Sequence, residues 1–442
     1  MKIDNSENKL RVALLGFGLD NQALLSFFDK HKAPIDLTIC DLRGLEKLPP
    51  HETKNLELNY RLGKKFNHNL GEFDLLFRAP GWPISCPGIQ AALKEGSDLS
   101  SPLNLFFELC PSKNIIGVSG TKGKGTTATL IYRSLQDNLR KEKSKQKVFL
   151  GGNIGITPIS FLGKIKKDDF VVLELSSFQL EDLNYSPKIS VLTNLFKEHL
   201  SPADPNNPNY HTSLNKYWQA KLNIAKNKEC LYLVANKSLE KKLEKEKIKA
   251  KKIYFSESFL PSKLSGDYNR QNIAAAFEVA KLLKIKKENF ENTIKNFKNL
   301  EHRLELVSEK NGVKFFDNSF STTPESTALD LLSFNNKIIQ IAGGADKGAD
   351  FYPLAKIIKK KVSELILLPG AGTERLKKEL KKISFDTKKI KEAKSMEEAV
   401  KIAKEKAEEN SVVLLSTACA SFGLFKNYKE RGDLFKKYVR QK

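Results

Sequence analysis

The segment Gly117-Val-Ser-Gly-Thr-Lys-Gly-Lys-Gly-Thr-Thr-Ala-Thr-Leu130 places closely spaced glycines and two lysines between an apolar run and an amphipathic segment. The apolar run Ile115–Val118 predicts a buried strand, and Ala128, Ile131 and Leu135 fall on one face of a predicted helix. Glycines at such a strand-to-helix turn let backbone N–H groups approach an anion, and a lysine there can reach phosphate oxygens. The segment therefore predicts a phosphate-binding loop in an α/β fold.

The hydroxyl residue that follows the lysine of a Walker-type loop is missing from this segment. Gly125 follows Lys124, and Thr126 is the nearest hydroxyl. Three interpretations are open: a broken nucleotide site, a structural glycine turn, or the phosphate loop of another enzyme family. We favour the last, because few folds need three glycines around two lysines for structure alone. The residues expected to contact the nucleotide are Gly120, Thr121, Lys122, Gly123, Lys124, Gly125, Thr126 and Thr127.

A carboxylate follows a second buried strand. The run Phe170-Val-Val-Leu-Glu174 ends in Glu174, which could coordinate Mg²⁺ at the edge of the sheet where the phosphate loop lies. A single glutamate after an apolar run is also typical of a solvated strand end. Its occurrence together with the phosphate loop favours the metal-binding interpretation.

Composition narrows the class of protein. The chain has 442 residues, of which 40% are apolar and 29% charged, so we expect a globular protein of two or three domains. No apolar run reaches the roughly 18 residues that span a bilayer, and the first residues lack the apolar core of a signal peptide. We therefore expect a cytoplasmic protein with no membrane partner. Five cysteines without paired spacing argue against a zinc or disulfide framework: Cys40, Cys86, Cys110, Cys230 and Cys419.

The formal net charge of +23 could indicate nucleic-acid binding. The excess is mostly lysine, spread through segments such as 141–147 and 241–252, where acidic residues are interspersed. Such runs are typical of solvated helix faces, which can also attract anionic substrates. We therefore expect no nucleic-acid partner.

The beginning of the chain resembles a dinucleotide-binding unit. The predicted strand from Arg11 leads into Gly16-Phe-Gly18, and a second predicted strand, Ile35–Cys40, is followed by Asp41. The third glycine of that pattern is absent, since Asn21 stands in its place. A nicotinamide site, a site for another nucleotide-derived ligand and a purely structural turn all remain open, and the second is favoured.

Alternating apolar runs and amphipathic segments continue to the end of the chain, which predicts parallel sheets with crossover helices. We expect an α/β protein of three domains, with boundaries near residues 111 and 299 and ranges of 1–111, 112–299 and 300–442. The later segments predicted as strands are 148–150, 189–194, 313–316, 337–341, 364–368 and 411–415, and a helix is predicted over 269–283.

Together, several further motifs make the chain resemble the Mur ligase family along its whole length. They are GGNIG (151–155), LELSSFQLE (173–181), His199, YWQAKLNI (217–224), DYNRQNIAAA (267–276), EHRLE (301–305), GGADKGADF (343–351) and STACASF (416–422). The resemblance implies an N-terminal Rossmann-like domain for a UDP-sugar, a central P-loop ATPase with a mostly parallel sheet, and a C-terminal Rossmann-like domain for an amino acid.

Within the family, the motifs are most similar to those of members that add D-glutamate to UDP-N-acetylmuramoyl-L-alanine in peptidoglycan synthesis. The reaction implied is ATP-dependent amide formation through an acyl phosphate, with Mg²⁺. The catalytic residues implied are Lys124, His199 and Lys221, and the metal-binding residues are Thr126, Glu174, His199 and Lys221, the last as a carbamate. We expect a monomer that acts in the cytoplasm.

The resemblance also implies residues that contact the small molecules. Those expected at the nucleotide, besides the phosphate loop, are Asn269, Asn272, Arg303 and Asn318. The expected contacts to the UDP-substrate are Gly16, Gly18, Asp41, Arg43, Asn153, Ser176 and Gln179. The expected contacts to glutamate are Thr322, Lys347, Ser421 and Phe422. Without the resemblance, Asn269 and Asn272 would read as packing or capping residues, and Arg303 as part of a salt bridge at a boundary.

The chain departs from the family pattern where the acceptor amino acid is expected. The family's Asn-Asp-Ser-Lys order is replaced by Asp317-Asn-Ser-Phe320, which exchanges the first two residues and removes the lysine. A charge-assisted hydrogen bond lost there would be worth about 1.5–3 kcal/mol. The alternatives are therefore a related ligase that adds L-glutamate or another amino acid, and a basic nucleotide- or nucleic-acid-binding protein.

Overall fold

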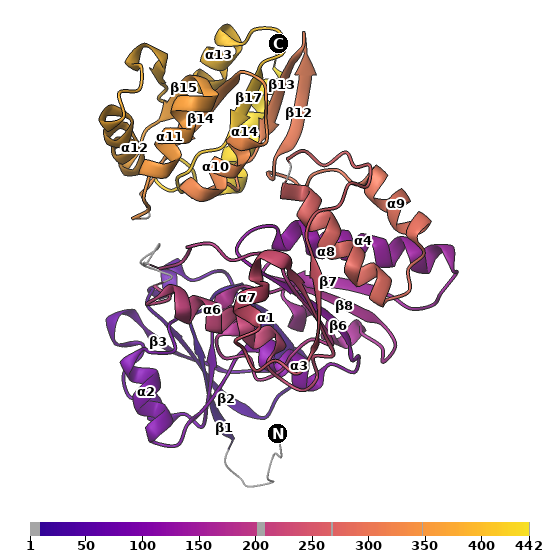
Figure 1. Ribbon diagram of the computed structural model, residues 1–442. Coiled ribbons are helices and arrows are strands. Elements are labelled where there is room, and N and C mark those ends of the chain that lie inside the picture. The colour runs from indigo at the N-terminus through magenta and orange to yellow at the C-terminus, as the bar shows by residue number, and fades with distance from the viewer. Residues whose placement is uncertain (1–8, 201–207, 267, 347, 442) are drawn as a thin grey trace. The chain divides into compact units, whose positions relative to one another are not determined.

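Three β-sheets organise the chain, which confirms the predicted α/β class (Figure 1). The computed structural model describes residues 9–200, 208–266, 268–346 and 348–441. The chain divides into two compact units. The first holds the described residues up to Ser256 together with Ala274–Phe290, and the second holds Glu257–Ile273 and the chain from Glu291 onward. The limits 1–111, 112–299 and 300–442 stay predictions.

The first sheet has the strand order β3-β2-β1-β4-β5, and its pairings are parallel. The predicted first strand is β1, and the predicted Gly-x-Gly turn is the loop between β1 and α1. The strands are β1 Leu10–Leu15, β2 Ile35–Asp41, β3 Leu58–Leu62, β4 Leu75–Arg78 and β5 Asp98–Ser100. The helices are α1 Leu19–Lys30, α2 Pro87–Lys94 and α3 Pro102–Leu109.

The second sheet, in the same unit, carries the phosphate loop. Its order is β11-β10-β9-β6-β8-β7, and its pairings are also parallel. The strands are β6 Asn114–Ser119, β7 Val148–Gly152, β8 Phe170–Glu174, β9 Ile189–Leu192, β10 Tyr232–Asn236 and β11 Lys251–Phe255. The helices from this stretch onward are α4 Lys124–Lys141, α5 Ser177–Leu180, α6 Leu214–Leu222, α7 Glu240–Leu243, α8 Tyr268–Leu282 and α9 Lys287–Asn296.

Helix α4 packs against β6, β7 and β8 (Figure 1) because its apolar stripe is continuous. Ala128, Ile131 and Leu135, the residues predicted on one face, are each at most 2% exposed. Glu174 ends β8 beside Val118 of β6 and Gly152 of β7. The carboxyl ends of parallel strands meet at one edge of a sheet, so the phosphate loop and this carboxylate lie at the same edge.

The third sheet lies in the second unit and has the order β12-β13-β17-β14-β15-β16. Its strands are β12 Glu305–Lys310, β13 Val313–Asp317, β14 Ile338–Gly343, β15 Val362–Leu368, β16 Ile390–Glu392 and β17 Val412–Leu415. Its helices are α10 Pro324–Leu332, α11 Tyr352–Lys361, α12 Ala371–Lys382, α13 Met396–Lys406 and α14 Tyr428–Arg440. Strand β12 is antiparallel to β13, whereas the other pairings are parallel.

Two apolar cores cover the two faces of this third sheet. One contains side chains from α10, α11 and α12, such as Leu331, Leu354 and Leu376. The other contains side chains from α13 and α14, such as Val400 and Phe435. Helices on both faces of a mostly parallel sheet are the arrangement of a doubly wound fold.

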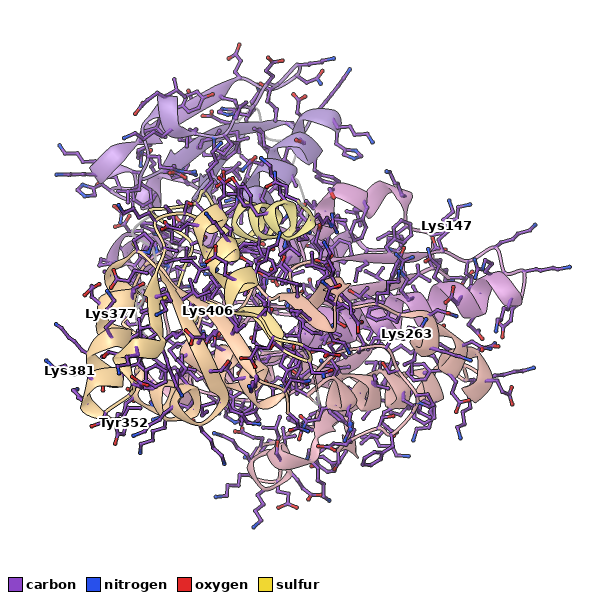
Figure 2. The ribbon with its side chains drawn as sticks, turned by 90° about the horizontal axis from the view of Figure 1, so that it is seen from above. Lys147, Lys263, Tyr352, Lys377, Lys381 and Lys406 are labelled. Atoms are coloured by element: carbon purple, nitrogen blue, oxygen red, sulfur yellow. The ribbon has the colours of Figure 1, made fainter. Side chains whose placement is uncertain are left out.

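The excess of lysine lies largely on the surface. Lys147 and Lys381, for example, are exposed, and Figure 2 shows their side chains at the outside of the molecule. Several exposed lysines pair with acidic neighbours, as Lys337 does with Glu408. Among the described residues, no helix combines the length and apolar character that crossing a membrane requires. The five cysteines are buried, free thiols.

Candidate active site

The phosphate loop leaves β6 at Ser119 and enters α4 at Lys124. Gly120 and Gly123 have φ of +141° and +83°, values that favour glycine, and Gly123 is the N-cap of the helix. A side chain at Gly120 would collide with the hydroxyl of Thr193. The turn is therefore compatible only with glycine at its first position.

Hydrogen bonds with the two residues that follow β9 fix the shape of this loop. The N–H of Thr121 donates to the carbonyl of Asn194 at 3.0 Å, and the N–H of Lys122 donates to the side-chain oxygen of Asn194 at 2.8 Å. The Thr193 hydroxyl donates to the Lys122 carbonyl at 2.6 Å. The loop shape is thus fixed by the protein itself. Sequence reasoning missed Thr193 and Asn194 because neither belongs to a recognisable phosphate-loop pattern.

Lys124, Gly125, Thr126 and Thr127 form the first turn of α4, whose N-terminus favours negative charge. The Lys124 ammonium donates a hydrogen bond to the Thr121 carbonyl at 2.9 Å. Gly125, Thr126 and Thr127 are buried, and Thr126 is 8% exposed. The structure places Thr126 at the third helical position, one residue after the position that a Walker-type loop uses.

Glu174 is buried at the end of β8 and is 2% exposed. One of its carboxylate oxygens, Oε1, accepts a hydrogen bond of 3.4 Å from the side-chain amide of Asn153, whereas Oε2 is buried and has no hydrogen-bond partner among the residues that the structure describes. A buried carboxylate oxygen without a partner is costly unless a cation or donor lies nearby. These features fit a site for a divalent cation that has oxygen ligands.

Lys221 of α6 is buried beside the phosphate loop. Its ammonium donates a hydrogen bond of 2.7 Å to the carbonyl of Gly120 and lies 4.6 Å from the centre of the Tyr217 ring. Burial, reinforced by the charge of Lys124, lowers the pKa of Lys221 well below its ordinary value, against the opposing effect of Glu198 and Glu174. A buried lysine with a lowered pKa holds a larger fraction of the neutral, nucleophilic amine.

His199 follows an acidic residue that sequence reasoning missed, Glu198. The Glu198 carboxylate pairs with the Lys122 ammonium at 2.6 Å and lies 3.7 Å from Nε2 of His199. Burial opposes ionisation of Glu198, but the charges of Lys122, His199 and Lys124 lower its pKa to about 2. Desolvation by its neighbours, reinforced by Lys124 and opposed by Glu198, lowers the pKa of His199 to about 4, although 42% of the side chain is exposed. A lowered pKa favours the neutral imidazole, the form that binds a metal ion.

A cluster of rings supports His199. The Phe178 ring makes an edge contact with His199 and stacks on His211 with both ring centres at 4.9 Å. The N–H of His211 donates to the His199 carbonyl at 2.8 Å, and His199 has a φ of +59°. Nε2 of His211 lies 2.9 Å from the Ser177 hydroxyl. The sequence gave no reason to assign a role to His211, because a single histidine before a helix is common on protein surfaces.

Two buried polar residues, Asp41 and Asn21, form hydrogen bonds with the predicted Gly-x-Gly turn of the first sheet. The Asp41 carboxylate accepts hydrogen bonds from the N–H of Phe17 at 2.6 Å and from the Arg43 side chain at 2.8 Å. Burial raises the pKa of Asp41, but these hydrogen bonds outweigh it and hold the pKa below the ordinary value. Asn21 donates to the Gly16 carbonyl at 2.8 Å, which explains an asparagine where a dinucleotide fold has glycine.

Gly16 has a φ of +77° and Gly18 is the N-cap of α1. No neighbouring atom lies within 4 Å of the place where a Cβ of Gly18 would be. The structure thus brings Gly16, Gly18, Asp41 and Arg43 together at one end of the first sheet.

The other predicted substrate residues of this unit lie near α5. Ser176 is the N-cap of α5 and forms a capping box with Gln179, whose side-chain amide lies 3.5 Å from the Asp20 carboxylate. Asn153 contacts Glu174 through both its backbone N–H and its side chain. Asn153, Ser176 and Glu174 therefore occupy neighbouring positions around the end of β8.

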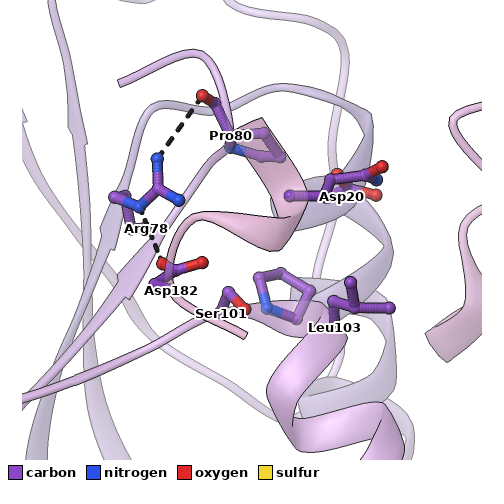
Figure 3. A pocket seen from close by; sticks show the side chains of 8 residues that line it. Asp20, Arg78, Pro80, Ser101, Leu103 and Asp182 are labelled. Atoms are coloured by element: carbon purple, nitrogen blue, oxygen red, sulfur yellow. Dashed lines mark hydrogen bonds and ion pairs between the residues drawn. The ribbon is translucent and has the colours of Figure 1, made fainter. Parts of the chain in front are cut away.

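A small pocket near α5 is organised by the buried Arg78, which is 1% exposed (Figure 3). Its guanidinium pairs with Asp182 at 2.7 Å and donates to the carbonyl oxygens of Trp82 and Phe178 at 2.7 and 2.9 Å. These bonds join β4 to the α5 segment. Sequence reasoning gave no role to Arg78, because an arginine that ends an apolar run usually lies in solvent.

In the second unit, the predicted nucleotide residues are held by internal hydrogen bonds. The Asn272 side chain donates to that of Asn269 at 2.7 Å, and Asn269 donates to the Ser265 carbonyl at 2.6 Å. Both asparagines are buried. The Asn318 N–H donates to the carbonyl of Leu415 at 2.8 Å, at the ends of β13 and β17.

The predicted glutamate residues lie on two adjoining loops of the second unit. The Thr417 hydroxyl donates to the Ser321 carbonyl at 3.2 Å, so the loop that holds Thr322 lies beside the one that leads to Ser421. Ser421 is buried and Phe422 is 49% exposed. Lys347 lies outside the residues that the structure describes.

The comparisons with known proteins agree with this architecture. The Mur ligase middle domain model matches residues 118–258, and the model named Mur ligase, glutamate ligase domain matches residues 302–419. The chain is 35% identical to a UDP-N-acetylmuramoylalanine–D-glutamate ligase from Acetivibrio thermocellus, over 99% of this chain and 98% of that one. A protein of the same name from Clostridium tetani is also 35% identical, over 97% and 96% of the two chains.

Solved structures show the same fold at low sequence identity. A MurF ligase from Thermotoga maritima in complex with ADP is 16% identical, with a TM-score of 0.59 over 98% of this chain and 96% of that one. A UDP-N-acetylmuramate-alanine ligase from the same organism is 17% identical, with a TM-score of 0.56 over 98% of both chains. The family models and the full-length relatives show an ATP-dependent acid–amino-acid ligase. More specifically, the chain belongs to the Mur ligase family.

Proposed function

We propose that the chain adds D-glutamate to UDP-N-acetylmuramoyl-L-alanine in an ATP- and Mg²⁺-dependent step of peptidoglycan synthesis. Similarity over nearly the full length to two proteins named for D-glutamate ligation supports this substrate pair. The observation that carries the reaction type is the convergence of the phosphate loop, the Glu174 carboxylate and the Lys221 amine at one edge of the second sheet.

In the first step, a carboxylate oxygen of the UDP-substrate forms a bond to the γ-phosphorus of ATP, and the bond from that phosphorus to ADP breaks. Lys124 and the N-terminus of α4 stabilise the negative charge that develops on the phosphoryl oxygens. The product is an acyl phosphate on the substrate. No protein nucleophile is required.

In the second step, the amine of glutamate attacks the acyl carbon, phosphate leaves, and the nitrogen loses a proton as the amide forms. Glu174, Thr126, His199 and Lys221, the last as a carbamate, would hold Mg²⁺, which supplies charge neutralisation in both steps. The unpartnered Oε2 of Glu174 and the neutral His199 support this assignment. The neutral amine that burial favours at Lys221 supports carbamate formation, because CO₂ reacts with an uncharged amine.

The remaining assignments follow the same proposal. Residues 1–111 bind the UDP-sugar through Gly16, Gly18, Asp41 and Arg43, residues 112–299 bind ATP, and residues 300–442 bind glutamate. The other proposed contacts are Asn153, Ser176 and Gln179 to the UDP-substrate, Asn269, Asn272, Arg303 and Asn318 to the nucleotide, and Thr322, Lys347, Ser421 and Phe422 to glutamate. We propose a monomer that acts in the cytoplasm, where ATP is supplied, and sedimentation equilibrium tests the oligomeric state.

Phosphate release with UDP-N-acetylmuramoyl-L-alanine, ATP and a panel of amino acids tests the function. We expect D-glutamate to support turnover and L-glutamate, D-aspartate and L-alanine to support little. The absence of the family's lysine at position 320 leaves L-glutamate or another amino acid as a second candidate acceptor. Equal rates with D- and L-glutamate would contradict the D-glutamate assignment, and faster turnover with another amino acid would identify that acceptor.

A further inference from the structure

The side chain of Arg303 stacks on the aromatic ring of Phe320. The Arg303 guanidinium lies 3.6 Å from the centre of the Phe320 ring, and Phe320 is 38% exposed. A guanidinium within about 6 Å of a ring centre is attracted to the electron-rich face of the ring. The two residues also meet through the backbone, since the N–H of Phe320 donates to the carbonyl of His302, the residue before Arg303, at 3.2 Å.

The ring itself is fixed by its neighbours in the second unit. Tyr428 makes an edge contact with Phe320, with ring centres at 5.1 Å, and another with His302 at 6.1 Å. A ring braced in this way can hold a guanidinium in one place, whereas a mobile side chain would not.

The backbone on both sides of Arg303 is equally constrained. His302 and Leu304 have φ of +58° and +52°, a conformation that side chains rarely adopt. Nδ1 of His302 lies 2.7 Å from the buried Asp317 carboxylate, and a side chain in place of Gly432 would collide with the His302 ring. The exchange that puts aspartate at position 317 therefore gives the imidazole next to Arg303 a charged partner.

These contacts explain the departure from the family pattern at position 320. A lysine at this position would bring a second cation close to Arg303, whereas the phenylalanine attracts the guanidinium. Stacking occupies the flat face of a guanidinium and leaves its N–H edge available for an anion. We propose that Phe320 is a positioning residue for this reaction, which holds Arg303 ready for the phosphates of the nucleotide and has no part in binding the acceptor amino acid.

This inference rests on the proposed function, in which Arg303 contacts the nucleotide. It is tested with the full-length chain by a double-mutant cycle of Phe320→Leu and Arg303→Ala. Phe320→Trp preserves an aromatic face. Tyr352→Leu serves as the matched control, because Tyr352 is 42% exposed and lies under the Lys356 ammonium at 4.3 Å. Urea unfolding establishes that each variant is folded.

Two quantities are measured for each variant: the Kd of the non-hydrolysable analogue AMPPNP, and the KM values for ATP and D-glutamate. We expect Phe320→Leu to raise the Kd and the KM for ATP by about three- to tenfold, the factor that one partly exposed cation–π contact supplies. The KM for D-glutamate should stay unchanged. Phe320→Trp should restore the wild-type values, Tyr352→Leu should leave them unaltered, and Phe320→Leu should have no further effect once Arg303 is alanine.

The positioning role is overturned if Phe320→Leu weakens AMPPNP binding equally with and without Arg303, or if it raises only the KM for D-glutamate. It is also overturned if the wild-type chain does not bind AMPPNP. If the wild-type chain binds AMPPNP but releases no phosphate with D-glutamate, the proposed substrates are wrong. In that case the double-mutant cycle, measured through the Kd of AMPPNP, still tests the role of Phe320.

Discussion

The ammonium of Lys221, on α6, donates a hydrogen bond of 2.7 Å to the carbonyl of Gly120, the first glycine of the phosphate loop. The two residues are in contact although 101 positions separate them in sequence. The same amine is buried, and burial lowers its pKa well below the ordinary value. Carbamate formation on this amine would replace a buried positive charge with a negative one suited to a metal.

Lys221→Ala should lower the rate of D-glutamate-dependent phosphate release by about 100-fold or more, the order found for loss of one charge-stabilising group. Short carboxylates such as acetate should partly restore the rate, because they can occupy the space left by a carbamate. Lys216→Ala, on the exposed side of the same helix, is the control and should remain active. Absence of rescue would argue against a carbamate, and ¹³C NMR after incubation with labelled bicarbonate tests the modification directly.

Lys124→Ala should abolish measurable ligation, with a loss of about 100- to 1000-fold, because in the proposed reaction the ammonium stabilises charge on the transferred phosphoryl group. The far-ultraviolet circular dichroism and the urea midpoint should stay close to the wild-type values. Lys145→Ala, at an exposed position beyond the end of the same helix, should behave like the wild type. Normal turnover by a folded Lys124→Ala chain would refute the phosphate role.

Glu174→Gln should increase the Mg²⁺ concentration needed for half-maximal phosphate release, by about tenfold or more, since an amide is a weaker ligand for a hard cation than a carboxylate. EDTA should stop turnover of the wild-type chain, and added Mg²⁺ should restore it. Asp168→Asn, at an exposed site before the same strand, is the matched control. An unchanged Mg²⁺ dependence in Glu174→Gln would remove this residue from the metal site.

Asp41→Asn should destabilise the chain at pH 7 by about 1–3 kcal/mol, because its carboxylate holds buried donors from Phe17 and Arg43. The folded state lowers the pKa of Asp41, so this contribution is present above the ordinary value of 3.8 and is lost as the pH falls toward the lower folded value. Urea unfolding at pH 7 and at pH 3 measures the difference in unfolding free energy between the variant and the wild type. This difference should be smaller at pH 3.

Asp36→Asn is the control for that comparison, because Asp36 lies on the same strand but is exposed. It should change stability little at either pH. A stability loss in Asp41→Asn that is as large at pH 3 as at pH 7 would show that ionisation of Asp41 is not the cause. Weaker binding of the UDP-substrate by Asp41→Asn would in addition support the proposed ligand site in the first sheet.

The predicted strand at 115–118, the helix after it and the parallel strands ending at Asp41 and Glu174 are confirmed, because each has a strong local apolar pattern. Among the described residues, seven strands were not predicted: β3, β4, β5, β10, β11, β12 and β16. Most are short or carry mixed side chains, and each pairs with a neighbouring strand of its sheet. The assigned roles of the site residues stay predictions.

Sequence by itself determined the α/β class, the position of the phosphate loop and the family, since these depend on local spacing and on motifs that occur in order. It could not find Glu198, His211 or Arg78, whose surroundings come from distant segments. The lowered pKa values of His199 and Lys221 likewise arise from desolvation and charged neighbours, which only the tertiary structure decides. The stacking of Arg303 on Phe320 has the same origin, because side chains 17 residues apart meet only when the chain folds back on itself.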